Sequence, residues 1–326
     1  MAVDPVPYVV HGAKHSADVF RQAFHDSTGG GEGISTPTSF HVRQTATPSN
    51  QVRVRAGGAI ILNSYQGGAG QSYAVRNMSD TLVDVPASDS TGSKSYYIIV
   101  RISDPQFAGA APADPTVGPY VFMECVPQST TITDPHLKLA SVVVPASTAT
   151  IINSMITSMR DLAQPKMLTV NRSRPLNLDD VETLTMTDAS GERFPNAGGG
   201  QNIFVPEWAT RAIIETEWLM VNERPGNAYG AVWVEYGPLA SGGDTRQYST
   251  QRFRWNTQAG SDSARGIWKV SDDVPIPASL RGSSQVFSMR GYLTYTSAGS
   301  ARPQMDQHSG IVFKVTFMQV ADSSDT

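Results

Sequence analysis

The chain has little with which to build covalent, metal-bound or membrane-spanning structure. Cys125 is its only cysteine, which excludes an intrachain disulfide and any metal site made of several cysteines. No apolar run approaches the roughly 18 residues that a membrane-spanning helix needs, and no basic and apolar leader follows Met1. We therefore expect a protein that is made in the cytoplasm without a signal peptide and does not insert into a membrane.

Charge is also scarce. Asp, Glu, Lys and Arg make up 17% of the chain, against roughly 25% in an average soluble protein. Lys and Arg number 11 against 12 Asp and Glu in residues 1–166, and 14 against 17 in residues 167–326. Because neither half is basic and no run of Lys and Arg could neutralise a phosphate backbone, nucleic-acid binding is not expected.

Most of the chain has the pattern of short strands separated by turns. Between Gln51 and Asp104, five segments with strand character are spaced about 8–12 residues apart, which predicts an antiparallel meander. These segments are residues 52–55, 59–62, 73–77, 81–87 and 96–102. Two more strands are predicted over residues 120–126 and 137–144.

Two segments have the apolar spacing of amphipathic helices instead. The first is predicted to end before Gly29, and its apolar positions are Ala13, Ala17, Phe20 and Phe24. The second is predicted to end near Ala163, ahead of Pro165, and its apolar positions are Ile151, Ile152, Met155, Ile156, Met159 and Leu162. We therefore expect an N-terminal antiparallel β domain with two short amphipathic helices over residues 1–163.

The pattern changes after this domain. Residues 164–180 contain Pro165 and Pro175 and little periodicity, which predicts a linker. Residues 181–326 return to strands and turns, with at least six strands and no helix. This pattern predicts a C-terminal β-sandwich of jelly-roll type. The fold class is therefore mainly β, in two domains.

All five tryptophans lie in the C-terminal domain, where flat aromatic rings could bind sugars. Trp218 and Trp233 lie in apolar strands and are expected in the core. Trp255, flanked by Arg252 and Arg254, and Trp268, beside Lys269, are the better candidates for exposure. We therefore name Trp255 and Trp268 as candidate carbohydrate-binding residues, with core packing as the alternative.

Glu215 and Glu217 alternate along one strand, which would place their carboxylates about 6–7 Å apart. This separation lies between those of retaining and inverting glycosidases. Arg211 shares their face, and no apolar pocket that would raise a carboxyl pKa is evident. A solvated charged face is the favoured interpretation, and a cell-wall glycan hydrolase remains an alternative.

Two further patterns imitate known sites. His11 and His15 stand four apart, but Gly12 occupies the position of the glutamate in zinc proteases. Residues 29–33 are glycine-rich, yet they follow a predicted helix and lack the Lys-Ser/Thr of a phosphate loop. We interpret His11 and His15 as solvent-facing and residues 29–33 as a connector. No catalytic residue, metal or cofactor is predicted.

Roughly residues 11–165 resemble the N-terminal part of minor tail proteins of tailed phages that infect actinobacteria. The resemblance is carried by short motifs spread over many turns, with no catalytic motif among them. They are His15-Ser16-Ala17 leading to Gly29-Gly30-Gly31-Glu32-Gly33, Ala56-Gly57-Gly58-Ala59, Gly67-Gly68-Ala69-Gly70-Gln71-Ser72-Tyr73, Val75-Arg76-Asn77, Val85-Pro86-Ala87, Asp104-Pro105-Gln106-Phe107, Asp114-Pro115, Gly118-Pro119-Tyr120-Val121, Val143-Val144-Pro145-Ala146, Met155-Ile156-Thr157 and Arg160-Asp161-Leu162.

This resemblance implies a structural virion protein of the tail tip or baseplate. It further implies a homo-oligomer, most simply a trimer, that assembles with other tail proteins and contacts the host surface. The N-terminal domain would dock into the tail, and the C-terminal domain would bind a neighbouring tail protein or a cell-wall carbohydrate. The alternatives from other classes are a carbohydrate-binding receptor module and the hydrolase considered above.

Overall fold

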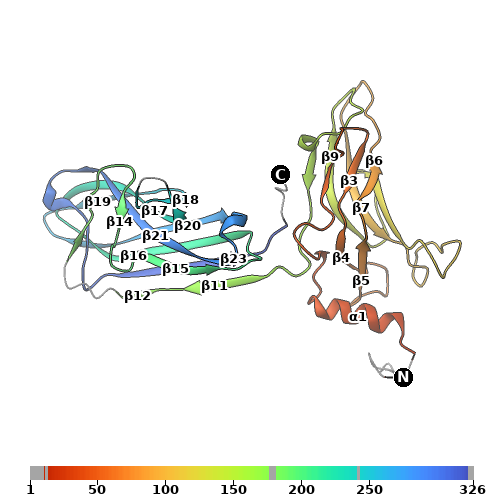
Figure 1. The fold of residues 1–326 in the computed structure, drawn as a ribbon, viewed down its shortest axis with the longest axis horizontal. Helices are drawn as coiled ribbons and strands as arrows, with labels where there is room; N and C mark the ends of the chain where they lie inside the picture. The colour runs from red at the N-terminus through yellow and green to blue at the C-terminus, as the bar shows by residue number, and fades with distance from the viewer. Residues whose placement is uncertain (1–10, 12–13, 176–180, 241–242, 322–326) are drawn as a thin grey trace. The chain divides into compact units, whose positions relative to one another are not determined.

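The computed structural model describes residues 11, 14–175, 181–240 and 243–321. The chain divides into two compact units. The first comprises residues 1–165 and 320–326, and the second comprises residues 166–319. Both are built mainly of antiparallel strands, as the sequence predicts (Figure 1).

Helix α1 (Ala17–Ser27) opens the described part of the first unit. The Ser16 hydroxyl accepts a hydrogen bond from the Val19 amide at 3.3 Å, which satisfies one of the amides left open at a helix start. Gly29 and Gly30 follow the helix with positive φ angles of 59° and 76°, conformations that glycine adopts at little steric cost. The first predicted helix is confirmed from Ala17 to its end before Gly29, and its predicted apolar position Ala13 lies outside the described residues.

Three antiparallel sheets surround one core in the first unit. Their orders are β1-β4-β5, β2-β3-β6 and β10-β9-β7-β8. The strands are β1 (Gly33–Ile34), β2 (Val42–Gln44), β3 (Gln51–Val54), β4 (Gly57–Leu62), β5 (Ser72–Asn77), β6 (Thr81–Asp84), β7 (Lys94–Ile102), β8 (Val121–Pro127), β9 (His136–Val144) and β10 (Ile156–Ser158). Each sheet contributes fully buried aliphatic side chains, including Ile61, Val52 and Ile98.

The strands predicted between Gln51 and Asp104 exist, but they do not form one meander. Strand β3 pairs with β6, while β4 and β5 pair with each other and with β1. Strand β4 also begins at Gly57, two residues before the segment 59–62 predicted from the sequence. An added Cβ on Gly57 would lie 2.5 Å from the Ser39 Cβ, so glycine permits a close approach here.

The second predicted helix, over residues 151–162, is wrong. The structure has one 3-10 turn (Asn153–Met155) followed by β10, which pairs with β9. Ile151 is fully buried, whereas Ile152 and Met159 are exposed. The apolar residues are spaced as in a helix, but the segment pairs with a sheet instead. A short isolated helix is marginal in water, whereas the edge of β9 supplies backbone hydrogen-bond partners that are already in place.

The second unit is a jelly-roll sandwich. One sheet has the strand order β11-β23-β16-β20, and the facing sheet has the order β15-β21-β17-β19. Every pairing is antiparallel, and most successive strands alternate between the two sheets, as in a pair of Greek keys. The predicted sandwich is confirmed, and Figure 1 shows its long strands β16, β21 and β23.

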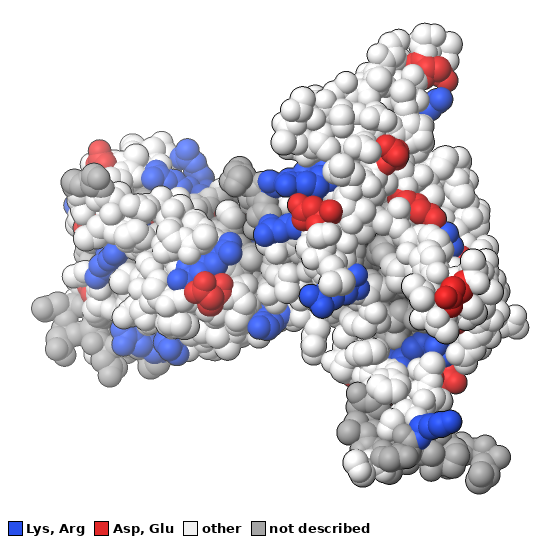
Figure 2. Space-filling model, turned by 45° about the vertical axis from the view of Figure 1, so that its right-hand side comes forward, with Lys and Arg blue, Asp and Glu red and all other residues white. Residues whose placement is uncertain are grey.

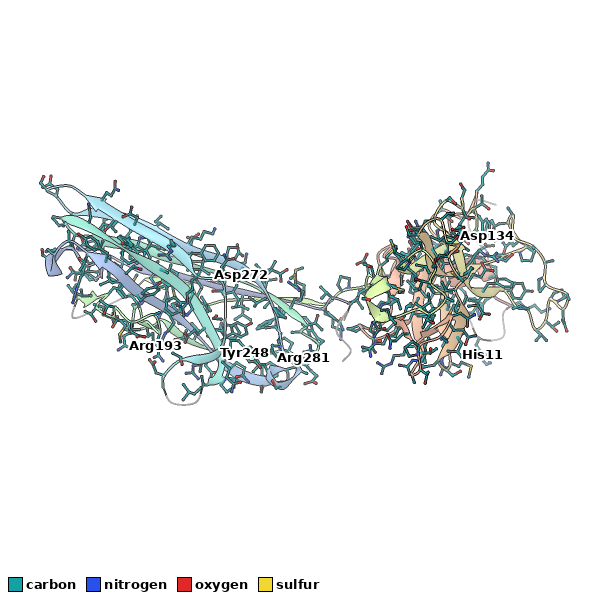
Figure 3. All side chains as sticks on the ribbon, turned by 90° about the horizontal axis from the view of Figure 1, so that it is seen from above. His11, Asp134, Arg193, Tyr248, Asp272 and Arg281 are labelled. Atoms are coloured by element: carbon teal, nitrogen blue, oxygen red, sulfur yellow. The ribbon has the colours of Figure 1, made fainter. Side chains whose placement is uncertain are left out.

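Eight principal strands and several short ones form this unit within its described residues. The principal strands are β11 (Met167–Asn171), β15 (Gly200–Val205), β16 (Arg211–Glu223), β17 (Gly226–Leu239), β19 (Phe253–Ala259), β20 (Ala264–Pro275), β21 (Ser283–Thr296) and β23 (Gly310–Met318). The short ones are β12 (Arg174–Pro175), β13 (Glu182–Thr183), β14 (Glu192–Arg193), β18 (Arg246–Ser249) and β22 (Gln304–Met305). Tyr248, labelled in Figure 3, stacks on Tyr236 with ring centroids 5.6 Å apart.

The predicted linker over residues 164–180 contains the first strand of the sandwich. Residues 167–171 form β11, which pairs with β23 from Met167↔Met318 to Asn171↔Lys314. Its side chains are mostly exposed, so the sequence shows little apolar alternation there. Residues 176–180 lie outside the described part of the chain.

Strand β16 alternates between buried and partly exposed side chains until a bulge. Ala212, Ile214 and Trp218 are fully buried, and Trp218 was expected in the core. The register against β20 then shifts between Trp218 and Val221, and Met220 adopts a φ of 55° and is 46% exposed. Val221 takes the inward position that strict alternation would give to Met220, since a bulge moves the following residues to the other face.

Candidate functional site

The two tryptophans proposed as a sugar platform lie in the sandwich core. Trp255 and Trp268 are each 6% exposed, and their rings stack with centroids 4.4 Å apart and an interplanar angle of 10°. Trp255 comes from β19 and Trp268 from β20, which belong to opposite sheets. The pair therefore holds the two sheets together and presents no surface to a ligand. The alternative interpretation, core packing, is the correct one.

Glu215 and Glu217 carry cationic partners. The Glu215 carboxylate accepts a hydrogen bond from Lys314 Nζ at 2.7 Å, and Lys269 Nζ lies 3.2 Å from Glu217. The hydrogen bond from Lys314 holds the pKa of Glu215 below its usual value. The general acid of a glycosidase needs a raised pKa, so the two carboxylates fit the interpretation as a solvated charged face.

Replacing Glu215 by glutamine is therefore expected to change little. Its lowered pKa means that the ion pair stabilises the fold above the unfolded carboxyl pKa and ceases to do so as pH falls through the folded value. Because both partners are partly exposed, the loss in free energy of unfolding at pH 7 should be under about 1 kcal/mol. Urea unfolding of Glu215→Gln at pH 7 and pH 3 would measure it. A loss that is larger at pH 3 would contradict the assignment.

The other residues considered as sites form no catalytic cluster in the part of the chain that the structure describes. His11 is exposed, and the ring of His15 meets Phe20 edge-on at 6.0 Å. Burial raises the pKa of the Cys125 thiol to about 12, so it stays protonated. Within the described ranges, no group of three or more His, Cys, Asp or Glu side chains could hold a metal ion. No helix there is long and apolar enough to cross a membrane.

Exposed aromatic rings gather instead on the outer face of the β17–β21 sheet. Tyr229 on β17 and Tyr295 on β21 are 40% and 48% exposed, and their rings stack with centroids 5.4 Å apart. Ala228 and Gly230, on either side of Tyr229, are buried, which shows that Tyr229 faces outward, and Tyr295 stacks on it there. A pair of aromatic rings left partly open to solvent is unusual on a sandwich whose other large rings are mostly buried.

Polar side chains flank this pair on the next strand. Asn256 and Arg254 of β19 lie opposite Tyr229 and Ala231, and both are exposed. Tyr292 lies on the other side of Ala231 and is half-buried. We call these five side chains the tyrosine face: Tyr229, Tyr292, Tyr295, Arg254 and Asn256.

The tyrosine face depends on a bulge that the sequence does not reveal. The register between β17 and β21 shifts between Tyr229 and Gly230, so that Leu293 pairs with Gly230 while Tyr295 pairs with Tyr229. Thr294 is the extra residue, and it lets Tyr292 and Tyr295 share the outer face although they are three apart. Strict alternation would place these two tyrosines on opposite faces. Sequence reasoning therefore missed the site.

The tyrosine face has the chemistry of a shallow saccharide site. Tyrosine offers a flat apolar ring and a phenolic hydroxyl that can donate or accept. Arg254 adds donors, and Asn256 adds both donors and an acceptor. A sugar ring presents the matching groups, with C–H bonds on its faces and hydroxyls around its edge. Nearby, Arg252 covers the Trp233 ring at 4.3 Å, so that ring is closed to a ligand.

No protein-family model matches the chain. No curated protein sequence matches it either. Among solved structures, it is similar to that of the infectious bursal disease virus Gx strain, with 12% identity, coverage of 90% of this chain and 76% of that chain, and a TM-score of 0.27. The VP2 subviral particle of the same virus gives 11% identity, coverage of 94% and 78%, and a TM-score of 0.27.

A further similarity is to the tandem CBM22 domains of Paenibacillus barcinonensis Xyn10C. It has 8% identity, covers 86% of this chain and 99% of that chain, and gives a TM-score of 0.24. These scores are too low to carry an inference about this chain. The mainly β architecture rests on the chain's own strands, and no family is assigned.

Proposed function

We propose that this chain is a structural protein of the tail tip or baseplate of a phage that infects actinobacteria. It assembles as a homo-oligomer, most simply a trimer, with other tail proteins. Its second unit contacts the host surface. The ion-paired carboxylates described above favour a binding role over a catalytic one.

The observation that carries this proposal is the structural role of the residues that resemble the tail-protein family. An added Cβ on Gly31 would lie 2.0 Å from the Ala163 carbonyl oxygen, and one on Gly33 would lie 2.2 Å from that of Asp161. The Ile34 amide also donates to Asp161 O at 2.8 Å. The first and last resembling motifs are therefore packed together. A resemblance that falls on fold-determining contacts supports a shared fold.

Immunogold electron microscopy of virions tests the location. An antibody raised against the purified chain should label the distal end of the tail, and light scattering of the purified chain should give the mass of three copies. Label confined to the head, or its absence from purified virions, would refute the assignment. A monomeric mass would refute only the oligomer.

The tyrosine face supports saccharide binding as the second candidate function. Tyr229→Ala and Tyr295→Ala should each weaken binding of the full chain to an actinobacterial cell-wall glycan by about fivefold, since stacking on one aromatic ring contributes on the order of 1 kcal/mol. The urea midpoint should hardly move, because both rings are partly exposed. A pull-down titration against wall fractions would measure the affinities.

Phe204→Ala is the matched control. Phe204 is 56% exposed and lies on β15, another strand of the same sheet, but it does not belong to the tyrosine face. The control should bind like the parent chain. Equal weakening by Phe204→Ala and Tyr229→Ala would indicate nonspecific apolar adsorption, and unchanged binding by both tyrosine variants would exclude this face.

A further inference from the structure

The first unit has a cavity of about 400 Å³ beside helix α1. Helix α1 is held near the start of β5, because Arg21 Nε donates to Gln71 Oε1 at 2.6 Å and His25 Nδ1 lies 3.3 Å from the Ser72 hydroxyl (Figure 1). The cavity lies where the helix, β5 and the start of β8 meet. Its lining is mostly apolar and includes Ala17, Arg21, Ala74, Val75, Ile102 and Val121.

The charged side chains that line this cavity are bonded to one another. Arg21 is 8% exposed, and its guanidinium group lies 2.6 Å from the Asp18 carboxylate and 3.3 Å from that of Asp104. The Tyr73 hydroxyl donates to the same Asp104 oxygen at 2.9 Å. On the face shown in Figure 2, charged side chains are likewise scattered among uncharged ones. The cavity therefore favours an apolar occupant over an ion.

Strand β5 presents an unpaired edge at this cavity. The Asn63 amide donates to Gln71 O at 2.9 Å, which marks a hydrogen-bonded pair beside the β4–β5 ladder. Such pairs alternate in an antiparallel ladder, so Tyr73 and Val75 bond to β4 while Ala74 directs its N–H and C=O away from it. Because β5 is the last strand of its sheet, this edge has no strand partner in the described part of the chain.

Strand β8 presents a second edge at the same cavity. The Ser103 amide donates to Tyr120 O at 2.9 Å, so the same alternation directs the N–H and C=O of Val121 away from β7. Strand β8 ends its sheet, and Val121 is 45% exposed. Open backbone groups of two strands therefore border the cavity, an arrangement that accepts an added strand.

Residues 5–10 have the sequence of a strand that pairs along one edge only. They read Pro-Val-Pro-Tyr-Val-Val, and β-branched and aromatic residues favour strands. Successive N–H groups of an extended strand point to opposite sides, so one side would carry the N–H groups of Val6, Tyr8 and Val10. Pro5 and Pro7 fall on the other side and have no N–H. Proline occurs in sheets at such edges, where the missing donor would face solvent.

We propose that residues 6–10 add to the edge of β5 as a short strand and fill this cavity. The six residues from His11 to Ser16 span up to about 20 Å when extended, and the next residue, Ala17, already lines the cavity. Attachment to the same chain gives the segment a high effective concentration at this edge. The contact also covers a strand edge that could otherwise pair with another chain. It belongs to the first unit and is independent of the proposed location in a virion.

Amide hydrogen exchange of the full chain, followed residue by residue by NMR, tests this contact. The Ala74 amide should exchange at least about tenfold more slowly than an unprotected amide, as expected for a hydrogen bond to an added strand. Val10→Pro should remove most of this protection, because it deletes an N–H on the side that faces β5. The Tyr73 and Val75 amides bond to β4 and should stay protected in every variant, which would show that β5 is folded.

Val9→Pro is the matched control. It removes the same valine side chain as Val10→Pro, but the N–H that it deletes points to the side of the two prolines, so protection of Ala74 should be kept. Equal loss in both variants, or an Ala74 amide that exchanges freely in the parent chain, would overturn the proposal. Protection at Val121 in place of Ala74 would assign the added strand to β8 and would overturn it too.

Protein concentration distinguishes the chain's own segment from that of a second copy. The exchange is repeated on dilute samples for which light scattering gives the mass of one copy. Protection of Ala74 should be unchanged there, because the segment and the edge belong to the same chain. Protection that is lost in these samples would mean that a neighbouring copy supplies the strand, and the assignment to the same chain would be wrong.

Discussion

Replacing Trp268 by alanine should destabilise the second unit by about 3–5 kcal/mol, the usual cost of removing a buried tryptophan. The ring is 6% exposed and stacks on Trp255 at 4.4 Å. It also approaches Phe194, with centroids 6.2 Å apart. The core cannot refill this volume, because Trp255 and Trp268 span the space between two sheets whose spacing is fixed by their other side chains. Trp255→Ala should behave in the same way.

Tryptophan fluorescence in urea measures this loss directly. All five tryptophans lie between residues 166 and 319, so the signal follows the second unit and not the first. Trp268→Phe should lose much less, since an aromatic ring remains in the stack. If Trp268→Ala keeps the parent midpoint while losing glycan binding, then Trp268 is a ligand platform and not a core residue.

The error about Trp255 and Trp268 shows what alternation predicts and what it omits. The pattern around Trp255 separates Phe253 and Trp255 from Arg252 and Arg254 correctly. The pattern does not say which face meets solvent. The neighbouring arginines lie on the opposite face from the tryptophan, so they indicate that their own face is the outer one and that the tryptophan faces the core. For Tyr292 and Tyr295 the pattern fails outright, because a bulge is set by pairing with β17. A single strand does not encode its partner's register.

The fold was predictable where local and tertiary preferences agree. Helix α1 has an N-cap at Ser16 and glycines after its last turn, and it forms as expected. The long strands of the sandwich alternate clearly and are recovered. The segment at Ile151–Leu162 has the apolar spacing of a helix but neither a cap nor a continuous buried face, and pairing of β10 with β9 decides its structure. Edge strand β11 lacks alternation because both of its faces are largely exposed.

Replacing Arg290 by methionine should cost about 3–5 kcal/mol in the free energy of unfolding of the second unit, the usual effect of breaking a buried ion pair. The Arg290 side chain is fully buried. It donates to the carbonyls of Ser190 and Gly191 at 3.0 and 2.8 Å, and to the Asp244 carboxylate at 3.0 Å. It therefore fixes the turn before β14 and the loop before β18 to the sheet beside Trp233.

The cost arises mainly from what the substitution leaves behind. The Glu235 carboxylate is 5% exposed and lies 3.6 Å from Arg290 Nε. It accepts hydrogen bonds from Trp233 Nε1 at 3.0 Å and the Arg246 amide at 2.9 Å, but those donors carry no full charge. Without Arg290 a buried anion would lose its cation, and two carbonyls would lose their donor.

A double-mutant cycle separates these contributions. Asp244→Asn should cost under about 1 kcal/mol, because the Asp244 side chain is 69% exposed. Glu235→Gln combined with Arg290→Met should be more stable than Arg290→Met alone, since the second change removes the unpaired buried charge. Urea unfolding followed by tryptophan fluorescence provides the four free energies of unfolding in the cycle: those of the parent chain, Glu235→Gln, Arg290→Met and the double variant. If the two changes are additive, Glu235 and Arg290 do not interact, and the buried arginine stabilises the unit only through the turn and loop that it binds.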